Sequence, residues 1–228
     1  MGANPNVAEV VSLMGESSRA AILTNLMDGR FHTATELAYM AEIKPQTASF
    51  HLAKLVDGDF VIVEKHGRFR YYQLANREIA NMLESFLSVS KPPKVRSLKQ
   101  SSQAKALHSA RTCYDHLAGS LGVGLTNAMV EEGYLKKEEK DFRVTPSGEQ
   151  FFTEFGLDMT ALRKKRRSFS RACLDWSERH HHLAGALGNG LAKRLFELEW
   201  ITQVPSSRAI KITNKGQSGL KQEFHLSI

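Results

Sequence analysis

The sequence predicts a mainly α-helical protein with small β-hairpins, an α+β fold arranged in two domains. Apolar residues keep helical spacing over most of the first ninety residues, and one β-branched and aromatic stretch there has the pattern of a hairpin. The remaining chain contains an internal repeat. A length of 228 residues suits two domains, since a domain usually has roughly 100 to 200 residues.

The first two helices are marked by apolar spacing and by their ends. Apolar residues recur with helical spacing over residues 7–14. We expect Ser17 or Ser18 to cap a second helix, because hydroxyl side chains accept hydrogen bonds from the first free N–H groups. This second helix should end at Asp28-Gly29.

The next two helices are separated by a short turn. Thr33 and Glu36 have the spacing of a capping box and open the first of them. Pro45 follows the turn and lies where the first turn of a helix tolerates proline, which places the second helix at residues 44–56.

A hairpin and one more helix complete the N-terminal domain. Residues 60–74 form two strand-like runs around Lys65-His66-Gly67. Asn76 is expected to cap an amphipathic helix over 76–88, which is a natural dimer surface. The order of helices and hairpin is typical of a winged helix-turn-helix. The sequence therefore predicts a DNA-binding and dimerisation domain at residues 1–90.

The second part of the chain begins with a basic segment and continues with two similar halves. Residues 91–103 are predicted to be a linker, stiffened at its start by Pro92-Pro93. Within a C-terminal domain at 104–228, the motif RTCYDHLAGSLGVGL recurs as RACLDW, an insertion, and HLAGALGNGL. We expect winged-helix-like repeats at 111–157 and 171–224, packed on each other with pseudo-symmetry.

The composition indicates a protein of the cytoplasm with an anionic partner. No apolar run approaches the roughly 20 residues needed to cross a bilayer, and no secretory signal is visible. The two cysteines are too few for a disulfide scaffold. The net charge is +7, but residues 1–90 carry 8 Lys and Arg against 10 Asp and Glu. The N-terminal domain must therefore contact DNA through a few well-placed cations.

The stretch TATELAYMAEIKPQTASFHLAKLVDGDFV, with its Ser49-x-His51-Leu52 step, resembles the helix-turn-helix of the ArsR/SmtB family of transcriptional regulators. The resemblance covers about residues 7–88. It implies a homodimeric repressor that binds a palindromic operator in double-stranded DNA, with the helix at 44–56 in the major groove and the hairpin at 60–74 as the wing.

The resemblance also implies which side chains contact DNA. The candidates on the helix are Lys44, Gln46, Thr47, Ser49, Phe50, His51 and Lys54, and those on the wing are Lys65, His66, Arg68 and Arg70. Gln46 can pair with adenine, Thr47 can meet a thymine methyl group, and Lys54 can reach a phosphate. His51 is expected to hydrogen-bond or pack at the base of the helix rather than contact a base.

The metal sites familiar in this family are absent from the N-terminal domain. Residues 36–40, before the turn, contain no cysteine, and residues 76–88 contain no histidine. If the protein senses a signal, we therefore expect the C-terminal domain to be the sensor. DNA binding itself should need no cofactor.

A candidate metal or redox site occurs in the repeats, at Cys113, His116, Cys173, His180 and His182. On helices, Cys113 would align with His116, and Cys173 with His180. Pseudo-symmetry could join the cysteines in a soft-metal site with His116 and one of the histidines at 180–182, or in a dithiol that oxidises. Either event could switch DNA binding. Alternatively, both cysteines are small buried hydrophobes, or a small organic ligand is the effector.

Other functions have less support in the sequence. The glycine pattern at 119–124 and 185–190 is reversed relative to a dinucleotide-binding motif, so close helix packing between the repeats explains it better. The basic run at 163–171, predicted on a helix, can be a solvated face or a DNA contact. A winged helix used only for protein docking is the main alternative, and a Cys/His enzyme is a weaker one. We therefore predict no enzymatic activity.

Overall fold

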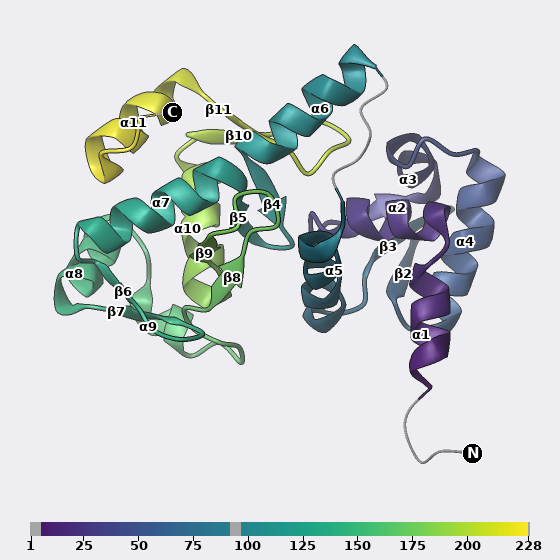
Figure 1. The fold of residues 1–228 in the computed structure, drawn as a ribbon, viewed down its shortest axis with the longest axis horizontal. Helices are drawn as coiled ribbons and strands as arrows, with labels where there is room; N and C mark the ends of the chain where they lie inside the picture. Colours follow the sequence, from purple (N-terminus) through teal and green to yellow (C-terminus); the bar gives the residue numbers. More distant parts are fainter. Residues whose placement is uncertain (1–5, 92–96, 228) are drawn as a thin grey trace. The chain divides into compact units, whose positions relative to one another are not determined.

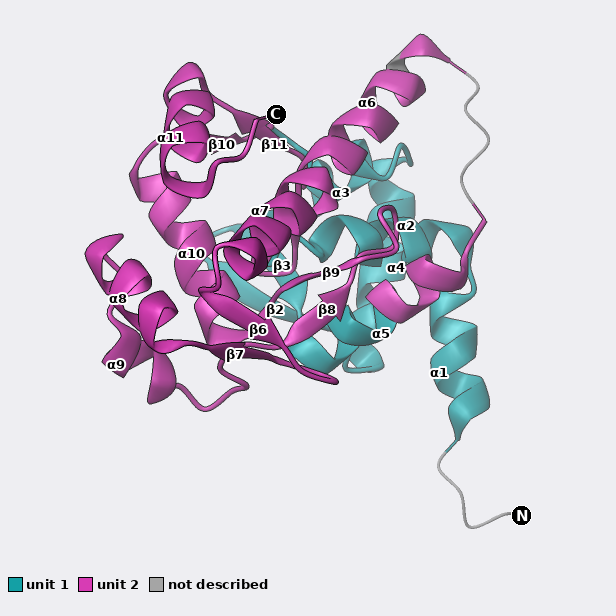
Figure 2. Cartoon of the chain, turned by 60° about the vertical axis from the view of Figure 1, so that its left-hand side comes forward, with its two compact units in different colours: residues 1–83, 205–207 teal, residues 84–204, 208–228 magenta. Residues whose placement is uncertain are grey.

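The computed structural model describes residues 6–91 and 97–227. It divides into two compact units, residues 1–83 with 205–207 and residues 84–204 with 208–228, coloured separately in Figure 2. Within the described ranges, each helix is too short or too polar to cross a membrane. The predicted mixture of helices and small antiparallel sheets is confirmed.

The first unit contains the predicted winged helix-turn-helix (Figure 1). Its elements are α1 (Val7–Met14), α2 (Ser17–Leu26), β1 (His32–Thr33), α3 (Ala34–Met40), α4 (Pro45–Asp57), β2 (Val61–His66) and β3 (Phe69–Leu74). The strands form one antiparallel sheet in the order β1-β3-β2. Gly67 has a φ of 59° in the turn of the β2-β3 hairpin, where glycine avoids the strain of a side chain.

Caps and a buried apolar core fix these helices. The capping box between Thr33 and Glu36 is present at the start of α3, and Pro45 occupies the first turn of α4 as predicted. Leu37 of α3 and Leu52 of α4 are completely buried with Ile22 of α2. The three helices thus share one core, which leaves the opposite side of α4 exposed.

The cap of α2 differs from the prediction. Glu16, not Ser17 or Ser18, accepts hydrogen bonds from the backbone N–H groups of Ser18 and Arg19. A carboxylate has two oxygens, so it can satisfy both N–H groups at once. Burial raises the pKa of Glu16, but these hydrogen bonds outweigh burial and lower the pKa to about 2.

Two helices lie at the junction of the predicted domains along the chain. The helix α5 (Arg77–Val89) begins after Asn76, whose side chain accepts from the N–H of Ile79 as predicted, and the boundary between the units falls within it. The helix α6 (Leu98–Ser109) overlaps the predicted linker at 91–103, so the end of that segment is helical. Pro92 and Pro93 lie outside the described residues.

The second unit repeats one arrangement of hairpin, helix, hairpin and helix. The first copy consists of β4 (Arg111–Cys113), β5 (His116–Ala118), α7 (Gly119–Glu131), β6 (Leu135–Lys137), β7 (Phe142–Val144) and α8 (Pro146–Glu154). After α9 (Met159–Arg163), the second copy consists of β8 (Ala172–Leu174), β9 (His181–Leu183), α10 (Gly185–Glu197), β10 (Ile201–Gln203), β11 (Ile210–Ile212) and α11 (Asn214–Phe224). The two copies share a single apolar core.

Two helical predictions in this unit are wrong. The cysteines and histidines of the repeats lie on or beside short β-hairpins, not on helices. The basic run at 163–171 is also mostly non-helical, because α9 ends at Arg163. Strands of three residues are too short to show the alternation by which a strand is recognised in a sequence.

Glycines at equivalent positions of the repeats bring each helix against its own hairpin. A Cβ atom on Gly122 would lie 2.5 Å from the carbonyl oxygen of Leu117, and one on Gly188 would lie 2.3 Å from that of Leu183. No side chain fits at such distances, so glycine is needed. The same added Cβ atoms would lie 3.7 Å from the Cβ of His182 and 3.4 Å from the Cβ of His116, each in the other repeat. The glycine pattern thus helps to place both histidines.

Candidate functional site

The exposed side of α4 presents most of the side chains predicted to contact DNA. Lys44, Gln46, Ser49, Phe50 and Lys54 are exposed, and Thr47 is half-buried. The ammonium group of Lys54 lies 4.5 Å from the centre of the Phe50 ring, so this cation and this aromatic ring share one face of the helix. The surface therefore offers hydrogen-bonding groups, one large apolar group and two positive charges.

His51 is a correction to the predicted set of DNA contacts. Its side chain is buried, and its Nδ1 atom lies 3.4 Å from a carboxylate oxygen of Glu16 and 3.5 Å from the guanidinium of Arg19. The reason is helical geometry, since His51 shares the inward face of α4 with Ala48 and Leu55. The histidine holds α4 against α2, which agrees with its expected packing role.

The wing supplies the other predicted DNA contacts. Lys65, His66, Arg68 and Arg70 are all exposed, and Lys65 lies opposite Arg70 in the register of the hairpin. The guanidinium of Arg68 lies 5.1 Å from the centre of the Phe69 ring. Lys65, Arg68 and Arg70 therefore present positive charges to an anionic partner, whereas Nε2 of His66 lies 3.5 Å from the carboxylate of Glu64.

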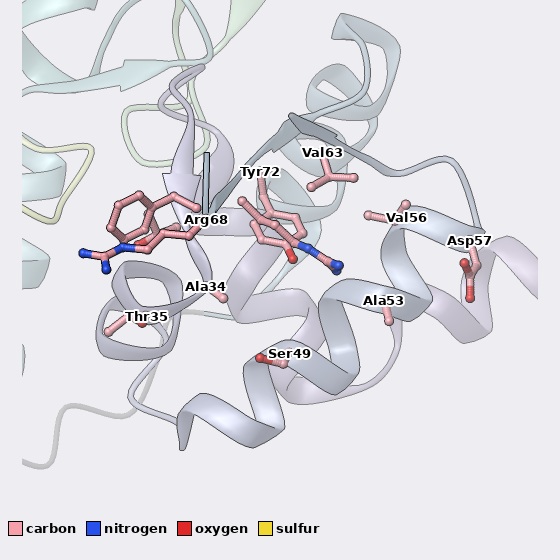
Figure 3. Close-up of a pocket in the computed structure, with 12 residues that line it drawn as sticks. Ala34, Thr35, Ser49, Ala53, Val56, Asp57, Val63, Arg68 and Tyr72 are labelled. Carbon is pink, nitrogen blue, oxygen red and sulfur yellow. The ribbon is translucent and has the colours of Figure 1, made fainter. Parts of the chain in front are cut away.

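A groove of about 500 Å³ separates α4 from the wing within the first unit. Figure 3 shows Ser49, Ala53 and Asp57 along the side of α4 that faces it, with Arg68 and Tyr72 from the wing. The start of α4 is a second polar feature of this face. Lys44 precedes Pro45 there, and no side chain of the described residues caps the helix. Uncapped N–H groups at a helix start attract anions such as phosphate.

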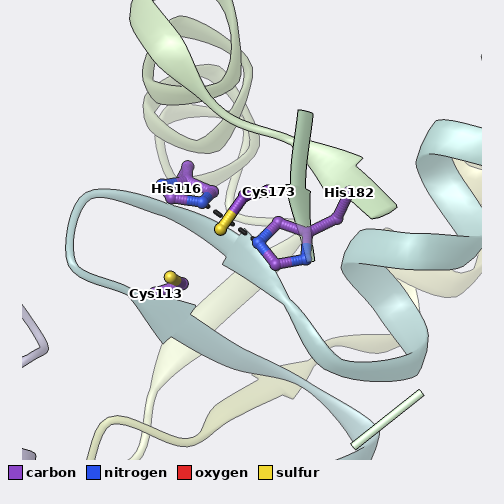
Figure 4. Close-up of side chains that lie close together, drawn as sticks. All are labelled: Cys113, His116, Cys173 and His182. Atoms are coloured by element: carbon purple, nitrogen blue, oxygen red, sulfur yellow. Dashed lines mark hydrogen bonds between the residues drawn. The ribbon is translucent and has the colours of Figure 1, made fainter. Parts of the chain in front are cut away.

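The second unit brings together four of the five residues predicted to form a metal or redox site. One donor atom from each of Cys113, His116, Cys173 and His182 lies within 4.8 Å of the others (Figure 4). His180 is exposed and lies outside this group, so its predicted membership is a correction. The reason is that strand pairing in the β8-β9 hairpin places His182, not His180, opposite Cys173.

Each repeat contributes one sulfur and one imidazole to the cluster. Cys113 lies opposite His116 in the β4-β5 hairpin, just as Cys173 lies opposite His182 in the β8-β9 hairpin. The two Nε2 atoms are 3.0 Å apart. The cluster therefore has the pseudo-symmetry of the repeat, with its donors divided evenly between the two halves.

A carboxylate lies near the Nδ1 atom of each imidazole. The Nδ1 atom of His116 lies 3.4 Å from Asp115, and that of His182 lies 3.4 Å from Asp175. Arg167 donates to Asp115, and Arg111 donates to both oxygens of Asp175 at 2.9 Å. The matched positions of the two aspartates in the repeat are the sequence signal for this arrangement. The two arginine partners could not be identified from the sequence.

The cluster shifts the acidity of its members. Burial lowers the pKa of His116, but hydrogen bonds with Asp115 and Cys173 outweigh this and raise it to about 9. A hydrogen bond from Cys113 lowers the pKa of Cys173, against the opposing effect of burial, and contacts with both imidazoles lower it further. The same hydrogen bond, together with burial, raises the pKa of Cys113. The environment thus favours a thiol at Cys113 and, at Cys173, a thiolate, the form in which cysteine binds metals.

Comparisons with known proteins identify a family model that matches part of the first unit and a relative that matches nearly the whole chain. A family model described as a helix-turn-helix domain matches residues 14–64, which include α4 and the first strand residues of the wing. The chain is also 52% identical over 225 residues to YdfF of Bacillus subtilis (strain 168), described as an uncharacterized HTH-type transcriptional regulator. This match covers 99% of the chain and 100% of the relative.

Solved structures resemble the first part of the chain. The homodimeric winged helix-turn-helix DNA-binding domain of Mb0332 from Mycobacterium bovis is 24% identical, with a TM-score of 0.34, and the match covers 39% of this chain and 89% of that one. The transcriptional repressor BigR from Xylella fastidiosa is 18% identical, with a TM-score of 0.36, and the match covers 38% and 88% of the two chains.

Proposed function

Because the chain belongs to the family of HTH-type transcriptional regulators, we propose that it is a homodimeric repressor that binds palindromic DNA. The resemblance of the first unit to an ArsR/SmtB-type winged helix-turn-helix agrees with this assignment. In the proposed complex, α4 enters the major groove and the wing follows the phosphate backbone. The observation that carries the proposal is the exposed polar face of α4 beside a wing that ends in cations.

The distribution of charge supports this surface over the rest of the first unit. No acidic residue occurs between Lys44 and Lys54, although acidic residues outnumber basic ones in residues 1–90 as a whole. The positive charges are thus gathered on α4 and the wing. Phosphates are attracted to such a face and repelled by the acidic remainder, so the charge pattern orients the domain on DNA.

The proposed contact with a second copy of the chain includes α1 as well as the helix α5, whose segment the sequence predicts as a dimer surface. Val7, Val10 and Val11 lie on one side of α1 and are 66%, 37% and 51% exposed. Apolar side chains grouped on one helix face commonly mark an interface. A twofold dimer would present two copies of α4, and two copies of one helix require a site with twofold sequence symmetry.

Selection from random duplex DNA tests the proposal. The purified full-length chain is incubated with a pool of random duplexes, and the bound fraction is sequenced, in parallel with reductant, peroxide or added zinc. We expect an enriched palindromic motif in at least one condition. Enrichment of no motif in any condition would favour the protein-docking alternative.

Gln46→Ala should relax base preference without abolishing binding. Gln46 is exposed in the first turn of α4, where a side-chain amide can make two hydrogen bonds to adenine. Losing them should cost about 1–3 kcal/mol at particular base pairs. Competition between the selected duplex and its single-base variants measures this loss. A matched Gln73→Ala variant, changed in β3, should keep the preference; equal profiles for Gln46→Ala and the unmodified chain would remove Gln46 from base recognition.

A further inference from the structure

We propose that Cys113, His116, Cys173 and His182 bind one Zn²⁺ ion, which joins the two repeats of the second unit. The site differs from the proposed DNA-binding surface in its residues and its chemistry. It lies entirely within one compact unit, and each repeat supplies half of its donors.

The donor set matches the preferences of zinc. Two thiolates and two imidazoles are a common ligand set of tetrahedral zinc sites. With bonds of about 2.3 Å to sulfur and about 2.0 Å to nitrogen, the ligand atoms of such a site are roughly 3.3–3.8 Å apart. The four donor atoms already lie within 4.8 Å of one another, so movements of about 1 Å complete the tetrahedron.

The orientation of the imidazoles favours a cation between them. The two Nε2 atoms face each other (Figure 4), and the Nδ1 atom of each ring lies 3.4 Å from an aspartate. At 3.0 Å, the two Nε2 atoms share one hydrogen bond while one of the two rings carries a proton on Nε2. A zinc ion that replaces this proton bonds to both Nε2 atoms at once. Zinc, with the sulfurs of Cys113 and Cys173, satisfies all four donors.

The groups next to the histidine Nδ1 atoms are also those found around zinc sites. Histidine ligands almost always donate their other N–H to a carboxylate, a carbonyl or water, which fixes the ring and raises its basicity. Asp115 is within hydrogen-bond distance of Nδ1 of His116, whereas Asp175 lies 3.4 Å from Nδ1 of His182 without a hydrogen bond. Arg167 and Arg111 hold the two carboxylates. A carboxylate beside Nδ1 thus occurs in both repeats, which a chance meeting of four polar side chains would not require.

The site is mostly buried, which indicates a structural role for the metal. Cys113, His116 and His182 are 3%, 6% and 0% exposed, and Cys173 is partly exposed. Four protein ligands fill the coordination sphere of zinc, so no position stays open for a substrate. The binding reaction takes Zn²⁺ and a free site that holds two protons among its sulfur atoms and its facing Nε2 atoms to the bound complex, and it releases those two protons with no change in oxidation state. The bound ion then ties β4-β5 to β8-β9.

Metal titration of the full-length chain without DNA tests this proposal independently of DNA binding. The reduced chain is titrated with Co²⁺, whose absorption reports tetrahedral thiolate ligation, and Zn²⁺ is then added in competition. We expect one ion per chain and displacement of Co²⁺ by Zn²⁺. Cys173→Ser and His182→Gln should each weaken binding at least tenfold, whereas the control His180→Gln, in the same segment, should bind like the unmodified chain.

A second measurement does not depend on how the variants fold. X-ray absorption at the zinc edge of the unmodified loaded chain should show two sulfur and two nitrogen neighbours. A shell of oxygen and nitrogen alone would overturn the proposal. So would equal binding by His182→Gln and His180→Gln, or a reduced chain that binds no ion and instead joins Cys113 to Cys173 when oxidised.

Asp115→Asn tests the contribution of the carboxylate to metal binding while the four ligands stay unchanged. Loss of a carboxylate behind a ligating histidine typically weakens metal binding about 10–100-fold. We expect a reduction in this range with the tetrahedral Co²⁺ spectrum preserved, because the four ligands are unchanged. Unaltered affinity would show that Asp115 serves only its ion pair with Arg167.

Discussion

Asp175→Ala is expected to destabilise the second unit by about 3–5 kcal/mol. Asp175 and Arg111 are completely buried and joined by two hydrogen bonds of 2.9 Å. Asp175 also accepts from the backbone N–H groups of Gly119 and Ser177 at 2.7 and 2.8 Å. Its removal leaves the charge of Arg111 buried without its partner, which costs far more than a lost surface contact.

Urea unfolding in the presence of a chelator measures this effect without a contribution from metal. The matched control is Glu138→Ala, which removes an exposed ion pair of 3.0 Å with Arg143 and should cost at most about 1 kcal/mol. Equal midpoints for the two variants would contradict the structural role of the buried pair. Asp175→Asn should fall between them, because it keeps an acceptor but loses the charge.

Arg68→Ala/Arg70→Ala is expected to produce the largest loss of DNA binding. Each phosphate contact that is lost should reduce the slope of log affinity against log salt by about 1. Two lost contacts thus make the fall in affinity between 50 and 200 mM salt roughly tenfold smaller. The affinity at low salt should fall for all DNA sequences alike, because phosphates carry no base information.

Fluorescence anisotropy of a labelled duplex across this salt range provides the measurement. The control is Lys136→Ala/Lys211→Ala, which removes two exposed cations from hairpins of the second unit. This control should keep the original slope. If it flattens the slope as much as Arg68→Ala/Arg70→Ala does, the contribution comes from total charge and not from the wing.

The first unit could be predicted closely because its signals are local. The Thr33–Glu36 capping box, Pro45 in a first turn and Gly67 in a hairpin each depend on residues close together in the chain. His51 shows the limit of this approach. Its position in α4 was predictable, but its contacts with Glu16 and Arg19 depend on how α2 packs against α4.

The cluster in the second unit was predictable only in part. The repeat places the two cysteines at equivalent positions, which suggested one shared site. Helical spacing predicted His180 as a ligand, but the register of the hairpin places His182 opposite Cys173 instead. The β8 and β9 strands have three residues each and are separated by an insertion, so their pairing leaves no periodic signal. The roles of Arg111 and Arg167 depend on contacts 52 to 66 residues apart in the chain.

Chemical footprinting of the chain on its selected duplex tests the central claim most directly. Dimethyl sulfate methylates guanine N7, which lies in the major groove. The account predicts two protected groups of guanines whose centres are about one helical turn apart, roughly 10 base pairs, because two copies of α4 occupy successive major grooves. A bound duplex whose guanines all stay reactive would contradict it, since α4 would then lie outside the major groove.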